Sequence, residues 1–410
     1  MSVSSMSFGS QNVGSTSSPQ AVTLTNTGDA TLNISSIQIG GDFAQSSNCG
    51  STVAAGANCT INVAFTPSTI GTRAGFIVFS DDSVNGSPQQ VTLSGTGTAP
   101  AASLSPSSLT FAAQRVHTSS AAQIVTLSNP GNATLLISSI TITGDFTQSN
   151  NCGATLIAGG SCSINVTFTP SALGNRVGVL TVTSNAPGGA ALSSVAGTGV
   201  ASMATVSPSS FSFAATMVSM TSSAQAVTIS NTGTATLNLS SIVTSGDFAQ
   251  TNNCGASVAP GGQCTVSVTF TPTAGGTRSG TLTISDDSLS GSPQTVTLSG
   301  VGLDFSISAT PSSITVSAGN AANYTTTVAA VGGTFSSAIG FSCSGLPAAA
   351  TCAFSPTTVT PGRGSGNTKM TITTTKRHSG SGTPAGTYTP TITGTSGSLR
   401  QSITVTLIVN

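Results

Sequence analysis

The stretch Asn48-Cys49-Gly50, followed by Cys59 ten residues after its cysteine, decides the fold because it occurs three times. It returns as Asn151-Cys152-Gly153 with Cys162, and again as Asn253-Cys254-Gly255 with Cys264. A fixed spacing of about a hundred residues indicates a tandem array of one folding unit. We therefore predict four domains, which are three copies at residues 1–98, 99–200 and 201–302 and a divergent domain at residues 303–410.

Short segments of each copy alternate between apolar and polar residues. In the first copy these include residues 21–25, 59–65 and 90–93, and turn residues such as Asn26-Thr27-Gly28 separate them. Such alternation predicts β-strands, and about seven strands in a hundred residues describe an immunoglobulin-like β-sandwich. The joints, such as residues 95–100, hold too few residues for a flexible coil. The sequence thus predicts an all-β protein of four tandem immunoglobulin-like β-sandwich domains in an elongated array.

The cysteines divide evenly among the four predicted domains. A structural zinc site needs four Cys or His ligands, but each domain holds two Cys and the whole chain only two His. We therefore predict local disulfides, each stabilising its domain by about 2–3 kcal/mol, and no metal. Disulfides imply an oxidising compartment. The predicted pairs are Cys49–Cys59, Cys152–Cys162, Cys254–Cys264 and Cys343–Cys352.

Charged residues make up 4% of the chain, and glutamate is absent. Nucleic-acid binding needs a basic surface with stacking aromatic residues, so we exclude that class of partner. The formal net charge of zero favours self-association, and other protein chains, including copies of this one, are the expected partners. Residues 1–302 carry a net charge of −4 and residues 303–410 one of +4. Lys376, Arg377 and His378 form a predicted exposed basic loop, either simply solvated or facing an acidic partner.

One charged pattern recurs with the copies. The aspartates Asp42, Asp145 and Asp247 occupy matching positions, and so do the arginines Arg73, Arg176 and Arg278. We expect each Asp to cap its turn or to pair with the Arg of its own domain. The functional alternative is that the row of arginines binds a partner.

Candidate catalytic groups are few. The two histidines, His117 and His378, lie in expected loops, and we interpret both as solvated residues rather than as catalytic bases. The paired acids Asp81-Asp82 and Asp286-Asp287 are expected to cap turns, with a calcium site as the alternative. The second copy has Ser184-Asn185 there, which weakens a shared metal role. We predict that the chain is not an enzyme and holds no cofactor. Because Trp is absent, a cell-surface glycan is an unsupported partner.

The repeated text resembles bacterial choice-of-anchor D domains, which are relatives of the ASPM–SPD-2–Hydin immunoglobulin-like modules. The resemblance covers about residues 1–302, and residues 303–410 resemble another immunoglobulin-like module of secreted bacterial proteins. It implies an extracellular or cell-surface location in bacteria, a role as stalk or binding repeat, and no catalytic residues. The residues that carry it are 25–28, 41–43, the pair Cys49 and Cys59, 63–67, 71–75 and 93–97.

The sequence therefore favours a non-catalytic extracellular structural or adhesive array, such as a surface stalk or spacer. One alternative is a subunit of an extracellular filament that assembles by head-to-tail or strand-addition contacts. A second is a carbohydrate-binding appendage of a larger enzyme. No apolar run reaches the roughly 18 residues of a membrane span, and no signal peptide is present. Since Met1 falls within an expected strand, we expect the natural protein to extend before it.

Overall fold

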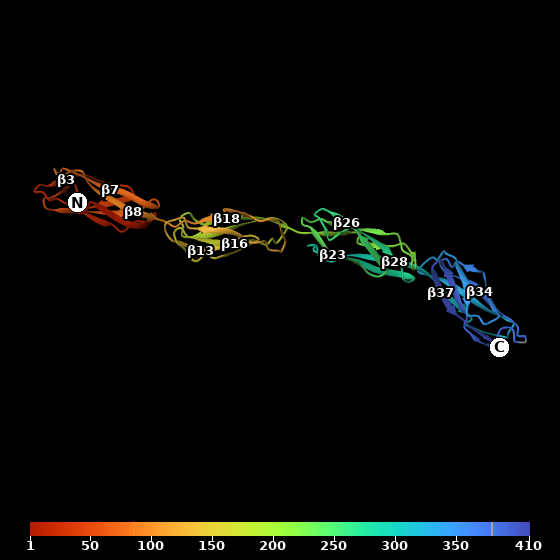
Figure 1. Ribbon diagram of the computed structural model, residues 1–410. Helices are drawn as coiled ribbons and strands as arrows, with labels where there is room; N and C mark the ends of the chain where they lie inside the picture. The colour runs from red at the N-terminus through yellow and green to blue at the C-terminus, as the bar shows by residue number, and fades with distance from the viewer. Residues whose placement is uncertain (85, 379) are drawn as a thin grey trace. The chain divides into compact units, whose positions relative to one another are not determined.

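The computed structural model describes residues 1–84, 86–378 and 380–410, and the regular structure of these residues is entirely β-strand (Figure 1). The prediction of tandem all-β, immunoglobulin-like domains is confirmed. The chain divides into two compact units, Met1–Val200 and Ala201–Asn410. We propose that the first unit holds repeat 1 (1–98) and repeat 2 (99–200), and that the second holds repeat 3 (201–302) and a C-terminal domain (303–410).

Repeat 1 contains a five-stranded sheet of order β1-β8-β7-β3-β5 and a three-stranded sheet of order β2-β6-β4. The first strand runs parallel to the last, and the other pairs are antiparallel. The strands are β1 (Ser5–Asn12), β2 (Gln20–Thr25), β3 (Leu32–Gly40), β4 (Phe43–Ser47), β5 (Thr52–Val53), β6 (Asn58–Phe65), β7 (Gly71–Asp81) and β8 (Gln89–Thr98).

Repeat 2 has the same two layers, and its first strand is divided between them. Its sheets have the orders β10-β18-β17-β13-β15, with β11 also on β18, and β14-β16-β12-β9. The strands are β9 (Ser103–Ser105), β10 (Ser108–Thr110), β11 (Gln114–Arg115), β12 (Gln123–Ser128), β13 (Leu135–Ile142), β14 (Phe146–Asn150), β15 (Thr155–Leu156), β16 (Ser161–Phe168), β17 (Gly174–Ser184) and β18 (Ala191–Val200).

Repeat 3 follows the same plan, except that its last strand continues into the next domain. One sheet has the order β19-β22-β26-β24, and the strands β25-β23-β27-β28 belong to a nine-stranded sheet, with β20 and β21 also on β28. The strands are β19 (Ala204–Ser207), β20 (Ser210–Ser212), β21 (Thr216–Met217), β22 (Gln225–Asn231), β23 (Leu237–Thr244), β24 (Phe248–Asn252), β25 (Ser257–Val258), β26 (Gln263–Phe270), β27 (Gly276–Asp286) and β28 (Gln294–Thr310).

In the C-terminal domain, β28 continues the nine-stranded sheet through β30, β34 and β32, and two further sheets have the orders β29-β38-β35 and β33-β31-β36-β37. The remaining strands are β29 (Ser313–Val316), β30 (Ala321–Val331), β31 (Ile339–Ser344), β32 (Ala350–Ser355), β33 (Thr358–Val359), β34 (Ser365–Thr374), β35 (Gly386–Tyr388), β36 (Thr391–Ser396), β37 (Leu399–Thr404) and β38 (Thr406–Val409).

The core of each repeat lies between its two sheets. Along β6, Cys59, Ile61, Val63 and Phe65 are buried, because alternate side chains of a strand point to the same face. Phe65 stacks on Phe43 with a ring-centroid distance of 4.9 Å, and matching pairs in repeats 2 and 3 stack at 4.9 and 5.0 Å. Such offset aromatic pairs add to the apolar burial that holds the sheets together.

Two short strands of repeat 1 were not predicted. β4 has one buried residue, Phe43, and β5 is only two residues long. Backbone hydrogen bonds to the edges of β6 and β3 form these strands. Side-chain periodicity cannot reveal strands that depend on a neighbouring edge.

Candidate functional site

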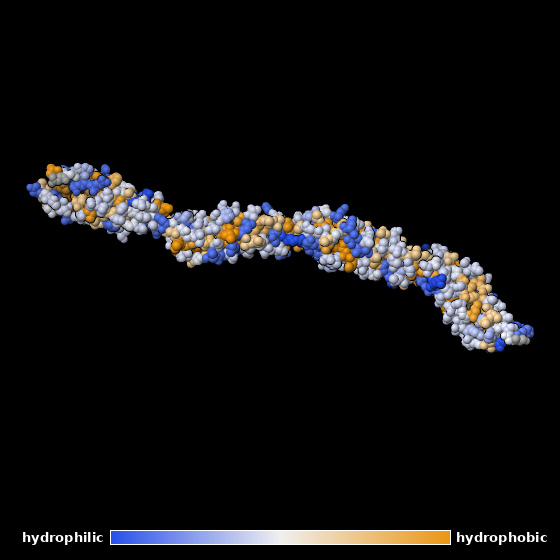
Figure 2. Space-filling view, viewed as in Figure 1, coloured by the Kyte–Doolittle hydropathy of each residue, from blue (hydrophilic) through white to orange (hydrophobic). Residues whose placement is uncertain are grey.

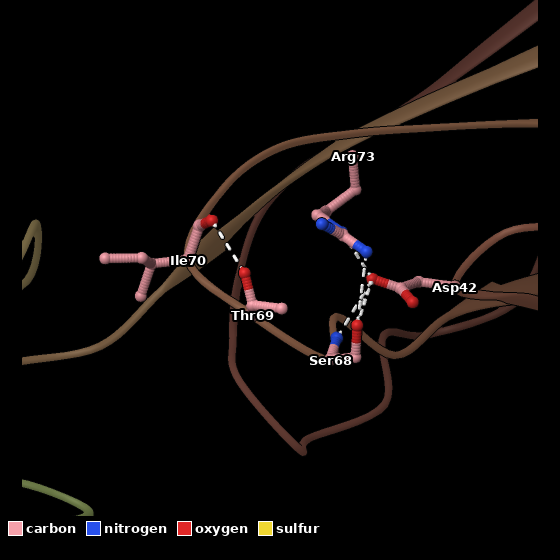
Figure 3. Close-up of polar contacts among 5 residues, drawn as sticks. All are labelled: Asp42, Ser68, Thr69, Ile70 and Arg73. Carbon is pink, nitrogen blue, oxygen red and sulfur yellow. Dashed lines mark hydrogen bonds and ion pairs between the residues drawn. The ribbon is translucent and has the colours of Figure 1, made fainter.

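The recurrent charges of repeat 1 form a cluster at the end of the sandwich. Asp42 lies in the turn between β3 and β4, Ser68 in the loop after β6, and Arg73 on β7. Arg73 Nε donates to Asp42 Oδ2 at 2.6 Å, and the backbone N–H and hydroxyl of Ser68 donate to the same oxygen at 2.9 and 3.1 Å. Figure 3 shows the guanidinium and the Ser68 donors converging on one carboxylate. The Asp42 side chain is 13% exposed, whereas the Arg73 side chain is 31% exposed and Ser68 lies at the surface.

Repeats 2 and 3 contain the same cluster. Arg176 Nε donates to Asp145 Oδ2 at 2.5 Å, and Arg278 Nε donates to Asp247 Oδ2 at 2.5 Å. The structure thus brings together each of the three expected Asp–Arg pairs. Sequence reasoning missed the hydroxyl residue, although Ser68, Ser171 and Thr273 each stand five positions before the arginine. That spacing is a signal that could have found it.

The clusters keep their carboxylates ionised. The Arg73 hydrogen bond, followed by the Ser68 backbone N–H, lowers the pKa of Asp42 to about 2. Arg176 and Ser171 lower the pKa of Asp145 to about 2 in the same way, and Arg278 lowers the pKa of Asp247. Partial burial opposes the shift in each case, so the hydrogen bonds to the charged form prevail. Each arginine charge is thereby neutralised within its own repeat.

Each cluster also supports the loop next to the end of the repeat. A side chain at Gly97 on β8 would overlap the carbonyl oxygen of Thr69 and would lie 2.9 Å from Pro67 Cβ. In repeat 3 the corresponding loop holds Gly275, where a Cβ would lie 2.8 Å from Val331 Cγ1 of the C-terminal domain. The cluster therefore shapes the surface from which the chain leaves the repeat.

The joint between repeats 1 and 2 is made by hydrogen bonds between the linker and the loop that holds Asn129 and Asn132, including a backbone bond from Asn132 N to Ala99 O at 3.1 Å. Asn129 Oδ1 accepts from Ala101 N at 3.0 Å, and Asn132 Oδ1 accepts from Ala99 N at 2.9 Å. Asn132 Nδ2 donates to Gly97 O at 2.9 Å. The linker thus lies against residues 129–134, the loop between β12 and β13, which we call the entry loop of repeat 2. The sequence did not predict this arrangement.

The joint between repeat 3 and the C-terminal domain is a continuous strand. Residues 294–302 of β28 pair with β27, and residues 304–310 pair with β30. Met217 and Val218 of repeat 3 pack against the core cluster of the C-terminal domain that includes Phe305. This joint therefore combines sheet hydrogen bonds with apolar packing.

Four disulfides close the expected pairs. The Cα–Cα distances are 4.9 Å for Cys49–Cys59, 5.2 Å for Cys152–Cys162, 4.9 Å for Cys254–Cys264 and 6.7 Å for Cys343–Cys352. In the described part of the chain, no cysteine is free. In repeat 1 the disulfide joins the segment after β4 to β6, the middle strand of the three-stranded sheet. The disulfides of repeats 2 and 3 join the segments after β14 and β24 to β16 and β26 in the same way.

The first acid of each pair caps a turn, because Ser83 N donates to Asp81 Oδ1 and Ser288 N donates to Asp286 Oδ1, both at 2.9 Å. The second acid of repeat 1 holds its loop to β3: Asp82 accepts from the side chain of Asn33 at 2.6 Å and from its backbone N–H at 2.9 Å, and these bonds lower the Asp82 pKa. In repeat 2 the neutral Asn185 Oδ1 accepts from Leu136 N at 2.8 Å in the same place. Because an amide fills this role, the role does not require a charge. No group of three or more His, Cys, Asp or Glu side chains gathers as a metal site among the described residues.

The basic loop and the other histidine are exposed. Arg377 Nε donates to Thr383 O at 3.0 Å, and the backbones of His378 and Ser381 pair with each other. Lys376, Arg377 and His378 are all exposed. His117 has φ of 64° in the turn after β11, where repeat 1 has Gly14 and repeat 3 has Ser219. Within the described residues, no helix is long and apolar enough to cross a membrane.

Family models match nearly the whole chain. The model described as Cep192 domain 4 matches residues 1–98 and 205–303. The model of the ASPM-SPD-2-Hydin (abnormal spindle-like microcephaly-associated) domain matches residues 99–190, and a family of unknown function, DUF5980, matches residues 306–410. The resemblance to ASPM–SPD-2–Hydin immunoglobulin-like modules is confirmed, whereas the bacterial origin stays a prediction.

Three solved structures are similar to the chain at low sequence identity. A Porphyromonas gingivalis W83 protein of unknown function is 16% identical, with 48% of this chain and 98% of that chain covered and a TM-score of 0.22. The PapD-like domain 7 of human CEP192 is 17% identical, with 25% of this chain and 86% of that domain covered and a TM-score of 0.21. Extracellular cadherin domains 1–5 of protocadherin gamma B2 are 12% identical, with 100% of this chain and 80% of that chain covered and a TM-score of 0.34. No curated protein matches the chain.

Proposed function

We propose that this chain, an array of ASPM–SPD-2–Hydin-type immunoglobulin-like repeats, is a non-catalytic extracellular stalk, spacer or adhesive segment of a bacterial cell surface. The observation that carries the proposal is that each repeat uses its recurrent charges internally. Asp42 and Arg73 serve the loop of their own repeat, as their counterparts do in repeats 2 and 3. The disulfides support an oxidising location.

Negative-stain imaging of the purified chain, together with static light scattering at increasing concentration, tests this proposal. A stalk or spacer is expected as single rods whose mass stays that of one 39.8 kDa chain. Compact globules in place of rods would contradict it. Growth of the scattering mass into long fibres would instead favour the filament alternative.

Self-association is the second candidate function, and a patch on repeat 2 favours it. Val177 and Val179 on β17 are 70% and 37% exposed, and Leu192 on the neighbouring β18 is 59% exposed. Repeat 3 has Ser279, Thr281 and Thr295 at the matching positions. Figure 2 shows apolar residues in small groups on a surface of otherwise near-neutral hydropathy. Exposed apolar groups on a sheet that carries little charge favour contacts between copies.

The chain offers its own matched control for this patch. In the triple variant Val177→Ser, Val179→Thr and Leu192→Thr, each residue of the patch is replaced by the residue that repeat 3 has at the same place in its folded sheet. If the patch drives association, the concentration-dependent rise in scattering mass disappears in this variant. An equal rise in scattering mass for the variant and the unaltered chain would show that the patch does not drive association.

A further inference from the structure

Parallel strand pairs occupy one kind of place in this protein. In the described part of the chain, each of them joins a segment near the start of a domain to the last strand of that domain: β1 to β8, β10 and β11 to β18, β20 and β21 to β28, and β29 to β38. The C-terminal domain has this pairing although its sequence differs from that of the repeats. The pairing of first and last strands is therefore a feature that all four domains share.

This pairing places the two ends of a domain at opposite ends of one strand pair. In repeat 3, Ser210 lies beside Thr297 at the start of the pair, and Met217 lies beside Leu303 at its end. The chain enters the pair at Ser210 and leaves it beyond Leu303. Tension on the chain therefore pulls β20 and β21 in one direction and β28 in the other, along the strands.

The hydrogen bonds of this pair run across the strand direction, so tension loads them in shear. Bonds that are loaded in shear share the force and must break together, whereas the bonds at the open end of a hairpin break one after another. In repeat 3 the backbone bonds of the pair include those from Thr297 N to Ser209 O at 3.0 Å, from Phe213 N to Ser299 O at 2.8 Å and from Val218 N to Leu303 O at 3.0 Å.

Two further contacts hold the first strand of repeat 3 in place. Ser299 Oγ on β28 donates to Phe211 O on β20 at 3.0 Å, so a side chain adds one bond to the pair. Phe213 is 4% exposed, and its ring centroid lies 5.6 and 5.9 Å from those of Phe248 and Phe270. Sliding β20 along β28 must therefore also draw a buried ring out of the core, which costs apolar burial.

The disulfides do not join these strands. Each pairs cysteines nine or ten positions apart. In repeat 3, Cys264 lies on β26, in the sheet that does not contain β28. The first and last strands are thus held to each other by hydrogen bonds and packing, which can form again after they break.

We propose that the paired first and last strands of each domain form a tension clamp, which keeps the domain folded while the chain is pulled by its two ends. The inference rests on the proposed role as a stalk or spacer, because a chain that connects two bodies carries the tension between them. It assigns the folded domains a mechanical function, resistance to extension, that adhesion alone does not require.

Force-clamp spectroscopy of the full chain, held by tags at its two ends, tests the clamp in repeat 3. A Gly and Ser segment inserted between Ser290 and Gly291, in an exposed loop, lengthens the unfolding step of this repeat by roughly 3.5 Å per added residue and so identifies it. The variant Ser299→Ala removes the hydroxyl that crosses the clamp. At constant force, we expect it to shorten the folded lifetime of repeat 3 by about fivefold, the effect of one hydrogen bond. An unchanged lifetime would overturn the proposal.

A matched variant in the same repeat separates the clamp from general stability. Ser240 Oγ donates to Ser285 O at 3.0 Å and joins β23 to β27, neither of which is the first or last strand. Ser240→Ala removes the same kind of bond outside the clamp, so the lifetime under force should stay unchanged. Equal shortening by the two variants would contradict the assigned path of the force.

The clamp and the stalk can fail separately. Imaging and light scattering test the stalk, whereas the lifetime under force tests the clamp. Single rods in which Ser299→Ala leaves the lifetime unchanged would refute the clamp alone. Compact globules in which Ser299→Ala shortens the lifetime and Ser240→Ala does not would support the clamp and refute the stalk.

Discussion

The two joints described within the compact units join their domains by different means. Between repeats 1 and 2, the linker forms hydrogen bonds with the side chains of Asn129 and Asn132 and with the Asn132 backbone N–H. Between repeat 3 and the C-terminal domain, β28 continues without a break and Met217 packs against the neighbouring core. The difference shows that the same type of repeat can be connected to the next domain by a hydrogen-bonded linker or by a strand that both domains share.

The largest expected effect is the loss of stability caused by a substitution at the shared-strand joint. Gly332 has φ of 84°, and a Cβ there would overlap the carbonyl oxygen of Gly302 on β28 and lie 2.8 Å from Gly276 N. We expect Gly332→Ala to destabilise the second unit by about 3 kcal/mol, because backbone strain and overlap combine. Calorimetry of the full chain measures the loss.

Gly362 provides a matched control for that substitution. It has φ of 62° in the same domain, but a Cβ there would contact nothing within 4 Å. Gly362→Ala should therefore cost only the left-handed backbone, about 1 kcal/mol. Equal losses for the two variants would mean that contact with β28 contributes nothing.

A smaller effect is expected at the hydrogen-bonded joint. Asn129 is fully buried, and its side chain makes four hydrogen bonds, including those to Ala133 O at 2.8 Å and Leu156 O at 3.0 Å. Asn129→Ala leaves these buried groups unpaired and is expected to cost about 2 kcal/mol. Asn132→Ala, at an exposed position, is expected to cost less than about 1 kcal/mol.

Asn26→Ala sharpens the same comparison. Asn26 makes three of the four hydrogen bonds, so its loss should be smaller than that of Asn129 by about the value of one hydrogen bond, roughly 1 kcal/mol. Hydrogen exchange of the loop that holds each asparagine measures the loss of stability in each variant. A larger loss at Asn26 than at Asn129 would contradict the role assigned to the linker bond.

The smallest effect is a dependence on acid at the end of repeat 1. The pKa of Asp42 is lowered to about 2, so the unfolded chain binds more protons than the folded one between about pH 4 and pH 2. The stability that the ion pair contributes is complete above this range and is lost as the pH falls through it. Protection of residues 67–70 and 97–101 should therefore decrease in acid, while residues 302–306 on β28 keep their sheet hydrogen bonds.

The paired variant Asp42→Asn and Arg73→Gln is the control for the acid effect. It removes the titrating carboxylate together with its partner, so the dependence on pH should disappear from the end of repeat 1 while repeat 2 keeps its own through Asp145. Persistence of the full acid effect in the variant would show that Asp42 is not its source.

The sequence alone predicted the repeated β-sandwich, the local cysteine pairs and the Asp–Arg pairs, because these features depend on spacing within one repeat. Alternation along residues 59–65 indicates a buried face directly, and a cysteine ten residues from its partner leaves few pairings. The hydroxyl of Ser68 was missed because serine is common in this chain, and only its repeated spacing of five residues from the arginine distinguishes it.

Only the tertiary structure decided the joints between the domains. The bond between Ala101 and Asn129 connects residues 28 positions apart, and nothing in either residue's neighbourhood in the sequence indicates the other. The continuity of β28 likewise depends on a neighbouring strand, β30, that accepts its hydrogen bonds.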